Sequence, residues 1–539
     1  MANRTGSTGS TGGTGGIGDE GSTSGAGAPP AGQPKSRDHR WQALGVCLVA
    51  GFMTLLDVSI VNVALPSIRD GLGMSESGLQ WILSGYALTF GLALVPSGRL
   101  GDARSRRAVF ITGLALFTAT SVLAGAAQSE AWLIAARLAQ GAAGGILVPQ
   151  VSGFIQQLFQ GAERGRAFGL LGATIGVSTA VGPLLGGLLI QAFGTAEGWR
   201  WVFYVNLPIG LLALPLAYRL LPPPPPRAVG RARLGGDFDP VGIVLLGAGT
   251  VLLLLPFLQR EQWSGAAKWL LLPPAAVLLA AFAGWEHHYA RRREPLVSMS
   301  LFRARSYGLG TLLSLVYFAG FTAIFFIFTL YLQNGLHYSA LAAGLSITPF
   351  ALGSGAAAAV GGRVVHRYGR PLVAAGLVLV VLGLAVAGGV VHLWSGPHLG
   401  WLTAAPLLLA GIGSGLVISP NQALTLGDVP VARAGSAGGV LQTAQRIGSA
   451  AGIAAVGSVF FTRLGGHPDD WAGAFQLGLA VAIGFVLLAL ATALADVLAG
   501  GTGSGAGSGA SSGTGGGSAR TAREEGVSRP AGVHPDEER

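Results

Sequence analysis

The sequence predicts an all-α membrane protein that crosses the lipid bilayer many times. Of its 539 residues, 50% are hydrophobic and only 11% are charged, whereas about a quarter of the residues in soluble proteins are charged. The mean hydropathy is +0.56. The chain holds fourteen apolar stretches, each long enough for the roughly 20 helical residues that cross a hydrocarbon core. This composition excludes a soluble enzyme or nucleic-acid-binding protein, despite the net charge of +10.

The fourteen stretches group into two sets of six with two between them. Residues 1–40 and 500–539 are dominated by small and polar residues, and we expect them to be disordered tails. A six-helix bundle is expected at 41–221, a linker with two inserted helices at 222–305, and a second six-helix bundle at 306–499. The inserted helices hardly contain internal polar residues, unlike the flanking sixes. The expected spans are 41–65, 79–98, 107–127, 132–154, 167–192, 200–221, 240–259, 267–285, 306–332, 340–361, 371–391, 399–425, 434–461 and 473–498.

The basic residues indicate the orientation in the membrane. With fourteen spans, 22 Arg and Lys residues fall on the side of the N-terminus and 5 on the opposite side. Cytoplasmic loops carry such an excess. We therefore expect a multi-pass protein of the cell membrane with both termini in the cytoplasm.

Two opposite charges interrupt the apolar spans of the first bundle. Asp57 lies in the middle of the first span, where a carboxylate costs about 2.5–3.5 kcal/mol on insertion scales. We interpret it as a proton carrier in a water-reachable pocket; the alternative is a packing role. Arg137 lies in the fourth span and either tunes that acid or clamps helices together. Further candidates for lining a central cavity are Thr54, Asn62, Gln140, Gln442 and Arg446.

Two more segments carry unusual patterns. Gly98–Arg107 is a short connection in which Asp102 lies among arginines, which suggests a salt-bridge latch on the cytoplasmic side; the alternative is an ordinary basic loop. Its candidate residues are Gly98, Asp102, Arg104, Arg106 and Arg107. The fifth span aligns small residues around a proline, which predicts close approach of another helix. Its candidate residues are Gly176, Gly182, Pro183, Gly186 and Gly187.

These segments resemble the sequence motifs of the major facilitator superfamily and, within it, of the fourteen-span drug:proton antiporters. Leu56–Pro66 resembles the first-helix motif, whose Asp implies a protonation site, and Gly98–Arg107 resembles motif A. Arg137–Gly141 resembles motif B, whose arginine is assigned to proton coupling, and Ser178–Gly187 resembles the antiporter motif C. The resemblance implies the major facilitator fold, in which two six-helix bundles rock about a central cavity.

We therefore predict an antiporter that exports amphipathic drugs or antibiotics by alternating access, driven by the proton gradient. It is not expected to be an enzyme or to use a cofactor or metal. Its expected partners are a small amphipathic substrate, protons and the bilayer, with no nucleic acid, and it is expected to work as a monomer. The alternative is a proton-coupled uptake symporter of the same fold.

Overall fold

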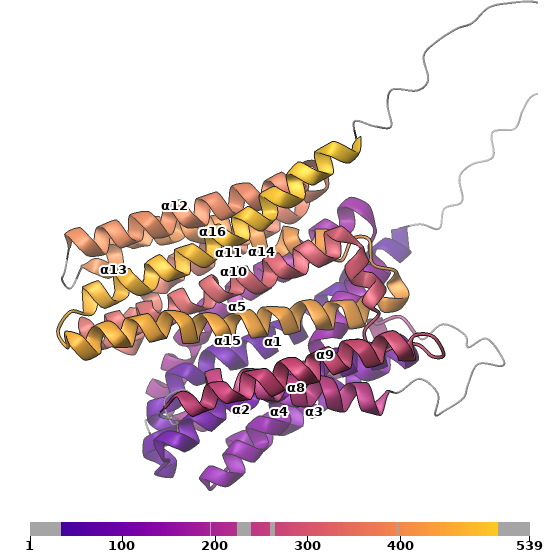
Figure 1. The fold of residues 1–539 in the computed structure, drawn as a ribbon. Helices are drawn as coiled ribbons and strands as arrows, with labels where there is room; N and C mark the ends of the chain where they lie inside the picture. The colour runs from indigo at the N-terminus through magenta and orange to yellow at the C-terminus, as the bar shows by residue number, and fades with distance from the viewer. Residues whose placement is uncertain are drawn as a thin grey trace, which may run out of the picture.

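The computed structural model describes residues 34–194, 196–223, 239–258, 265–394, 396 and 398–504, and its regular elements within these ranges are all helices (Figure 1). Most of the predicted tails and part of the predicted linker, residues 224–238, lie outside the described residues. The first helix begins at Pro34 and the last ends at Ser504, so both helices extend into the segments predicted as tails.

The first six-span half comprises seven α-helices and one π-helical turn. Serines that precede helices help to define where these begin: the hydroxyl of Ser75 accepts a hydrogen bond from the Gly78 amide, and Ser129 does the same for Trp132. The elements are α1 (Pro34–Leu72), α2 (Glu76–Leu100), η1 (Gly101–Ser105), α3 (Arg106–Gly125), α4 (Glu130–Leu158), α5 (Gly161–Phe193), α6 (Gly198–Tyr204) and α7 (Asn206–Leu220).

The second half repeats this plan. Gly369 joins two of its helices in a turn with φ of +55°, a conformation that favours glycine. Asp470 caps the last helix, and its hydrogen bond from Arg463 and that from the Gly473 amide hold the pKa of this carboxyl below its usual range. The elements are η3 (Met299–Arg303), α10 (Arg305–Leu330), η4 (Tyr331–Gly335), α11 (Ala340–Tyr368), α12 (Arg370–Leu393), α13 (Leu399–Leu402), α14 (Ala404–Thr425), η5 (Val431–Arg433), α15 (Ala434–Gly466) and α16 (Trp471–Ser504).

The inserted segment forms a helical pair, α8 (Pro240–Leu258) and α9 (Leu272–Tyr289), with the short η2 (Ala266–Leu271) before α9. The indole of Trp285 donates to Asp239 at 2.8 Å, which ties the two helices together. Of the pair, α8 packs against α2 of the first half and α15 of the second, and α9 packs on α8; the pair lies at the lower front of Figure 1. It therefore lies at the edge of the boundary between the halves.

One apolar core lies within the second half, and another joins the first half to residues of the second such as Tyr307 and Ala437. The halves meet mainly where α5 packs on α11 and where α2 packs on α15. The start of α1 and the end of α16 lie at the same end of the bundle (Figure 1). We call this the tail end and the opposite one the distal end.

Thirteen helical segments of the described chain are long and apolar enough to cross a membrane. The segment Glu76–Gly125 combines α2, η1 and α3 over 50 residues. Gly98 and Arg99, predicted in a loop, belong to the last turn of α2, and the π-helical turn continues to Ser105. Ser105 has extended backbone angles and caps α3, so the helical direction changes there.

Candidate functional site

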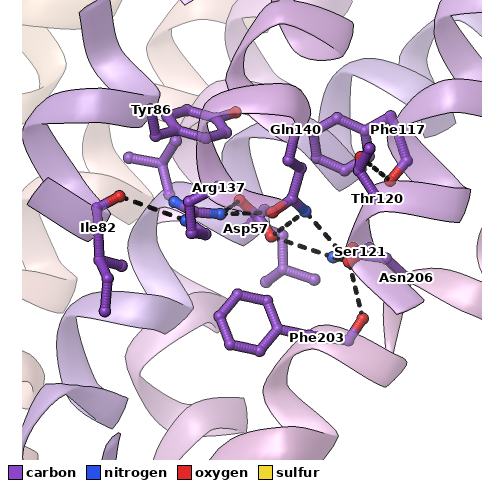
Figure 2. Close-up of polar contacts among 12 residues, drawn as sticks. Asp57, Ile82, Tyr86, Phe117, Thr120, Ser121, Arg137, Gln140, Phe203 and Asn206 are labelled. Atoms are coloured by element: carbon purple, nitrogen blue, oxygen red, sulfur yellow. Dashed lines mark hydrogen bonds and ion pairs between the residues drawn. The ribbon is translucent and has the colours of Figure 1, made fainter. Parts of the chain in front are cut away.

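A buried ion pair occupies the interior of the first half. The guanidinium of Arg137 on α4 donates to a carboxylate oxygen of Asp57 on α1 at 2.6 Å. The other carboxylate oxygen accepts hydrogen bonds from the amides of Gln140 at 2.9 Å and Asn206 at 3.2 Å. Figure 2 shows these groups of α4 and α7 converging on Asp57. The structure thus brings together the two predicted charges and Gln140.

A second layer fixes the ion pair. The hydroxyl of Ser121 on α3 accepts from both amides and donates to the backbone oxygen of Phe203. The Arg137 guanidinium also lies 4.2 Å from the centre of the Tyr86 ring. A buried charge pair is tolerated when hydrogen bonds satisfy its remaining atoms, and here side chains of α1, α3, α4 and α7 do so.

Asp57 does not contact the space between the halves in this conformation, contrary to the expected water-reachable pocket. Its side chain is 0% exposed and that of Arg137 is 1% exposed. Asn62, which faces the inter-half cavity, lies on another side of α1 because five residues rotate a helix by about 140°. A proton and a substrate at these two places would therefore not compete for the same atoms.

A cavity of about 260 Å³ lies between the halves toward the distal end. Its lining comes from α1 and α5 of the first half and from α10, η4 and α11 of the second. The lining residues are all uncharged, and several carry hydroxyl or amide groups beside the Phe325 ring. They are Ser59, Asn62, Val63, Pro66, Thr179, Ala180, Pro183, Phe325, Thr329, Gln333, Gly344, Ile347, Thr348 and Ala351.

Asp102 joins the two halves at the tail end. Its carboxylate accepts from the backbone amides of Gly435 at 3.0 Å and Ser436 at 2.8 Å, in the first turn of α15. It also pairs with Arg106 at 2.7 Å. A helix N-terminus attracts a carboxylate because its first amides have no partner within the helix. The latch therefore depends on one arginine and one helix end.

The other arginines of the predicted latch do not contact Asp102 through a hydrogen bond or ion pair in the described chain. Arg99, next to Gly98, pairs with Glu294 at 2.7 Å. Arg107 donates to the backbone oxygen of Tyr218 and lies over its ring. Arg104 is exposed. Gly98 contributes by letting the two helices come close together, because a Cβ there would collide with the Gly435 backbone.

The small residues of α5 allow close contact with two different helices. A Cβ on Gly176 would lie 2.7 Å from the Gly355 nitrogen on α11. Gly182 and Gly186 instead face Ser59 and Ile60 of α1. Gly187 makes a looser contact, its Cβ position lying 3.9 Å from the Leu341 side chain, and Pro183 lines the cavity.

Of the five residues predicted to line a cavity, Asn62 lines the one just described. Thr54 is buried and donates to the Gly51 backbone oxygen, and Gln140 belongs to the ion-pair network. Gln442 and Arg446 lie on α15, where Arg446 is 4.7 Å from the centre of the Phe90 ring on α2.

The sequence analysis missed Asn206 and Ser121, the two groups that complete the surroundings of Asp57. A polar amide side chain within an apolar span indicates a buried polar contact, and Asn206 could have been found in this way. Ser121 could not have been found in this way, since hydroxyl side chains are common in membrane helices. It also missed Gly435 and Ser436, whose contribution to the latch is made by backbone amides.

Two helical halves that enclose a cavity and close on one another at one end define a membrane transporter. Residues 47–453 match the Major Facilitator Superfamily, and the chain belongs to that family. It is a multi-pass membrane protein and not an enzyme.

Relatives with established descriptions are similar over most of the chain. A probable actinorhodin transporter of Streptomyces coelicolor is 38% identical, over 84% of this chain and 78% of its own length. The cephamycin export protein of Amycolatopsis lactamdurans is 35% identical, over 87% and 95%. The puromycin resistance protein of Streptomyces alboniger is 34% identical, over 84% and 90%.

Solved structures share the fold. The human organic anion transporter MFSD10 has a TM-score of 0.61 at 18% identity, covering 86% of this chain and 100% of its own. A proton:xylose symporter has a TM-score of 0.59 at 14% identity, covering 84% and 95%.

Proposed function

We propose that this chain exports an amphipathic antibiotic across the cell membrane in exchange for protons. Its relatives are named for antibiotic export or resistance, and the uncharged cavity between the halves suits a largely apolar molecule with hydroxyl or carbonyl groups. The observation that carries the proton coupling is the enclosed Asp57–Arg137 pair. Protonation of this buried carboxylate would remove the negative charge with which Arg137 pairs, and so would change the contacts around it.

The proposal includes fourteen membrane crossings with both termini in the cytoplasm. The segment Glu76–Gly125 would be about 75 Å long as one straight helix, more than twice the thickness of a hydrocarbon core. Its two parts, α2 and α3, both pack along α4, which supports two antiparallel crossings joined at Ser105. The arginine excess then places the tail end in the cytoplasm.

In this orientation the structure represents an outward-facing state. The tail end is closed by Asp102 on α15 and by Arg164, which donates to the Gly427 backbone oxygen at 2.8 Å. The cavity lies toward the distal, outer end. A substrate would leave from this state, and the cytoplasmic side would open when the Asp102 contacts break.

Proton and substrate would be coupled through α1. Protonation of Asp57 cancels its charge and releases Arg137, which still contacts Gln140 and the Tyr86 ring. The same helix carries Ser59, which donates to the Ser178 backbone oxygen on α5, and Asn62 in the cavity. A shift of α1 relative to α4 would therefore change the cavity.

The test is Asp57→Asn, which keeps the size of the side chain and removes its protonation. Cells that lack their own efflux pumps would express either protein and be grown with puromycin and with tetracenomycin C. We expect the variant to lose the resistance given by the wild type, down to cells without the protein, at equal amounts in the membrane.

The matched control is Asp70→Asn, an exposed acid on the same helix, which should keep full resistance. A protonophore should abolish export by the wild type. Undiminished resistance with Asp57→Asn would refute the proton site. Substrate-driven proton movement in the same direction as the substrate, measured in proteoliposomes, would indicate a symporter instead.

A further inference from the structure

The boundary between α2 and α15 is tight at the tail end and changes character halfway along. Gly98 faces the Gly435 backbone, and a Cβ on Gly439 would lie 2.7 Å from the Leu94 backbone oxygen. Further along α15, the guanidinium of Arg446 lies above the Phe90 ring of α2. Two glycine contacts are thus followed by a long cationic side chain.

Arg446 has no counter-ion among the residues that the structure describes. No carboxylate pairs with it in the described chain, and its side chain makes no hydrogen bond to a described residue, although it is only partly exposed. This contrasts with Arg137, which has Asp57, Gln140 and a backbone oxygen as partners. A guanidinium offers five donors and stays charged at any physiological pH. At this depth it needs an acceptor that these helices do not supply.

Two further donors near Arg446 also have no hydrogen-bond partner in the described part of the chain. Gln442 lies one turn earlier on the same face of α15 and makes no hydrogen bond within the described residues, although it is only 9% exposed. The hydroxyl of Tyr86 on α2 is buried without a hydrogen-bond partner among them. The Tyr86 ring stacks on that of Phe90, over which the Arg446 guanidinium lies. An unsatisfied buried polar group such as the Tyr86 hydroxyl is costly. Together with Gln442 and Arg446, which make no hydrogen bond within the described residues, it points to a ligand at this boundary.

The same aromatic residues connect this place with the proton site. Tyr86 stacks on Phe90 with ring centres 6.0 Å apart. Arg137 lies on the Tyr86 ring and Arg446 on the Phe90 ring. Arg137 has a carboxylate partner, Asp57, whereas Arg446 has none among the described residues.

We propose that Arg446, assisted by Gln442 and the Tyr86 hydroxyl, binds an acidic group, such as a carboxylate, of the transported molecule. The inference rests on the proposed export function and deepens it, because it assigns an anionic substrate class. A carboxylate matches a guanidinium in geometry and charge. The ligand brings the acceptor that is missing between α2 of one half and α15 of the other, and its aromatic body can lie against Phe90.

The test uses two probes that share an aromatic body, 2-naphthoate and 2-naphthamide. Binding to the purified full chain in detergent is measured from the rise in its thermal unfolding temperature with probe concentration. We expect the wild type to bind the acid more tightly than the amide. Arg446→Gln should weaken binding of the acid by about tenfold or more, as expected for a lost charge-assisted hydrogen bond, and leave the amide unchanged. Arg446→Lys should keep part of the preference.

The matched control is Arg367→Gln, because Arg367 also lies near an aromatic ring, that of Tyr368, but on the surface. It should bind both probes like the wild type. Equal responses of the wild type to the two probes, including no response, would overturn the assignment, as would unchanged binding of the acid by Arg446→Gln. If Arg446→Gln does not fold, the acid and the amide are compared with Arg446→Lys instead. A partial loss of the preference for the acid then supports the assignment, and an unchanged preference overturns it. Binding in detergent needs no proton gradient, so this result is independent of the Asp57→Asn export test.

Discussion

At the scale of single residues, Asp57 and Arg137 each depend on the other. Both side chains are almost completely enclosed, and the carboxylate accepts hydrogen bonds from three side chains. Removing one member of such a pair costs about 3–5 kcal/mol, because the other charge is left buried without compensation. Removing both charges leaves only neutral groups, and the cost should then be smaller.

This leads to a prediction for Arg137→Gln and for the double variant Asp57→Asn/Arg137→Gln. The single variant should lower the thermal unfolding temperature of the detergent-solubilised protein, and the double variant should recover part of that loss. Neither should export, since both lack the ion pair whose breaking we couple to transport. If the losses of Asp57→Asn and Arg137→Gln simply add in the double variant, the charges do not stabilise one another.

At the scale of elements, closure of the tail end depends on how near α2 comes to α15. Gly98 and Gly435 touch through their backbones, and this contact lets the amides at the start of α15 reach the Asp102 carboxylate. A larger side chain would push the two helices apart by a distance that breaks these hydrogen bonds. Because interfaces between packed helices adopt discrete arrangements, the consequence should be opening of the tail end.

We therefore expect Gly98→Val to expose residues that the closed tail end covers. Ser152 on α4 is 0% exposed and accepts a hydrogen bond from Gln422 of the other half at 3.3 Å. The variant Ser152→Cys should react slowly with a maleimide in the wild-type background and several times faster together with Gly98→Val. Gly45→Val is the control, since a Cβ on Gly45 meets no atom within 4 Å; an equal effect of both valines would contradict the role of Gly98.

At the scale of the whole molecule, hydropathy and charge predicted the helical membrane fold and the two residues at the centre of the site. Long apolar stretches have few alternatives to helices in lipid, and Asp57 and Arg137 stand out because charges are rare there. The surroundings of Asp57 were not predictable, since the contacts of Asn206 and Ser121 depend on how α3 and α7 are rotated against α1.

The contacts of the Asp102 latch were also only partly predictable from the sequence. The pattern around Asp102 indicated a charged contact but not which arginines take part. Helical rotation directs Arg99 to Glu294 and Arg107 to Tyr218, and of the arginines in the described ranges only Arg106 pairs with Asp102. The remaining partners are backbone amides of α15, a group that nearly every residue carries and that no sequence pattern marks. Which distant helix begins beside the carboxylate is a property of the fold, not of the local sequence.

The arrangement of the whole molecule makes one more prediction, about which side of the membrane reaches the cavity. Asn62 lines the cavity toward the distal end, whereas Ser152 is covered at the tail end. The one native cysteine, Cys47, is buried, so an introduced cysteine can be labelled alone. In intact cells, a membrane-impermeant maleimide added outside should label Asn62→Cys and leave Ser152→Cys unlabelled. A molecule that fills the cavity should slow the labelling of Asn62→Cys. Labelling of Asn62→Cys only in inside-out vesicles would place the distal end on the cytoplasmic side and make this structure an inward-facing state.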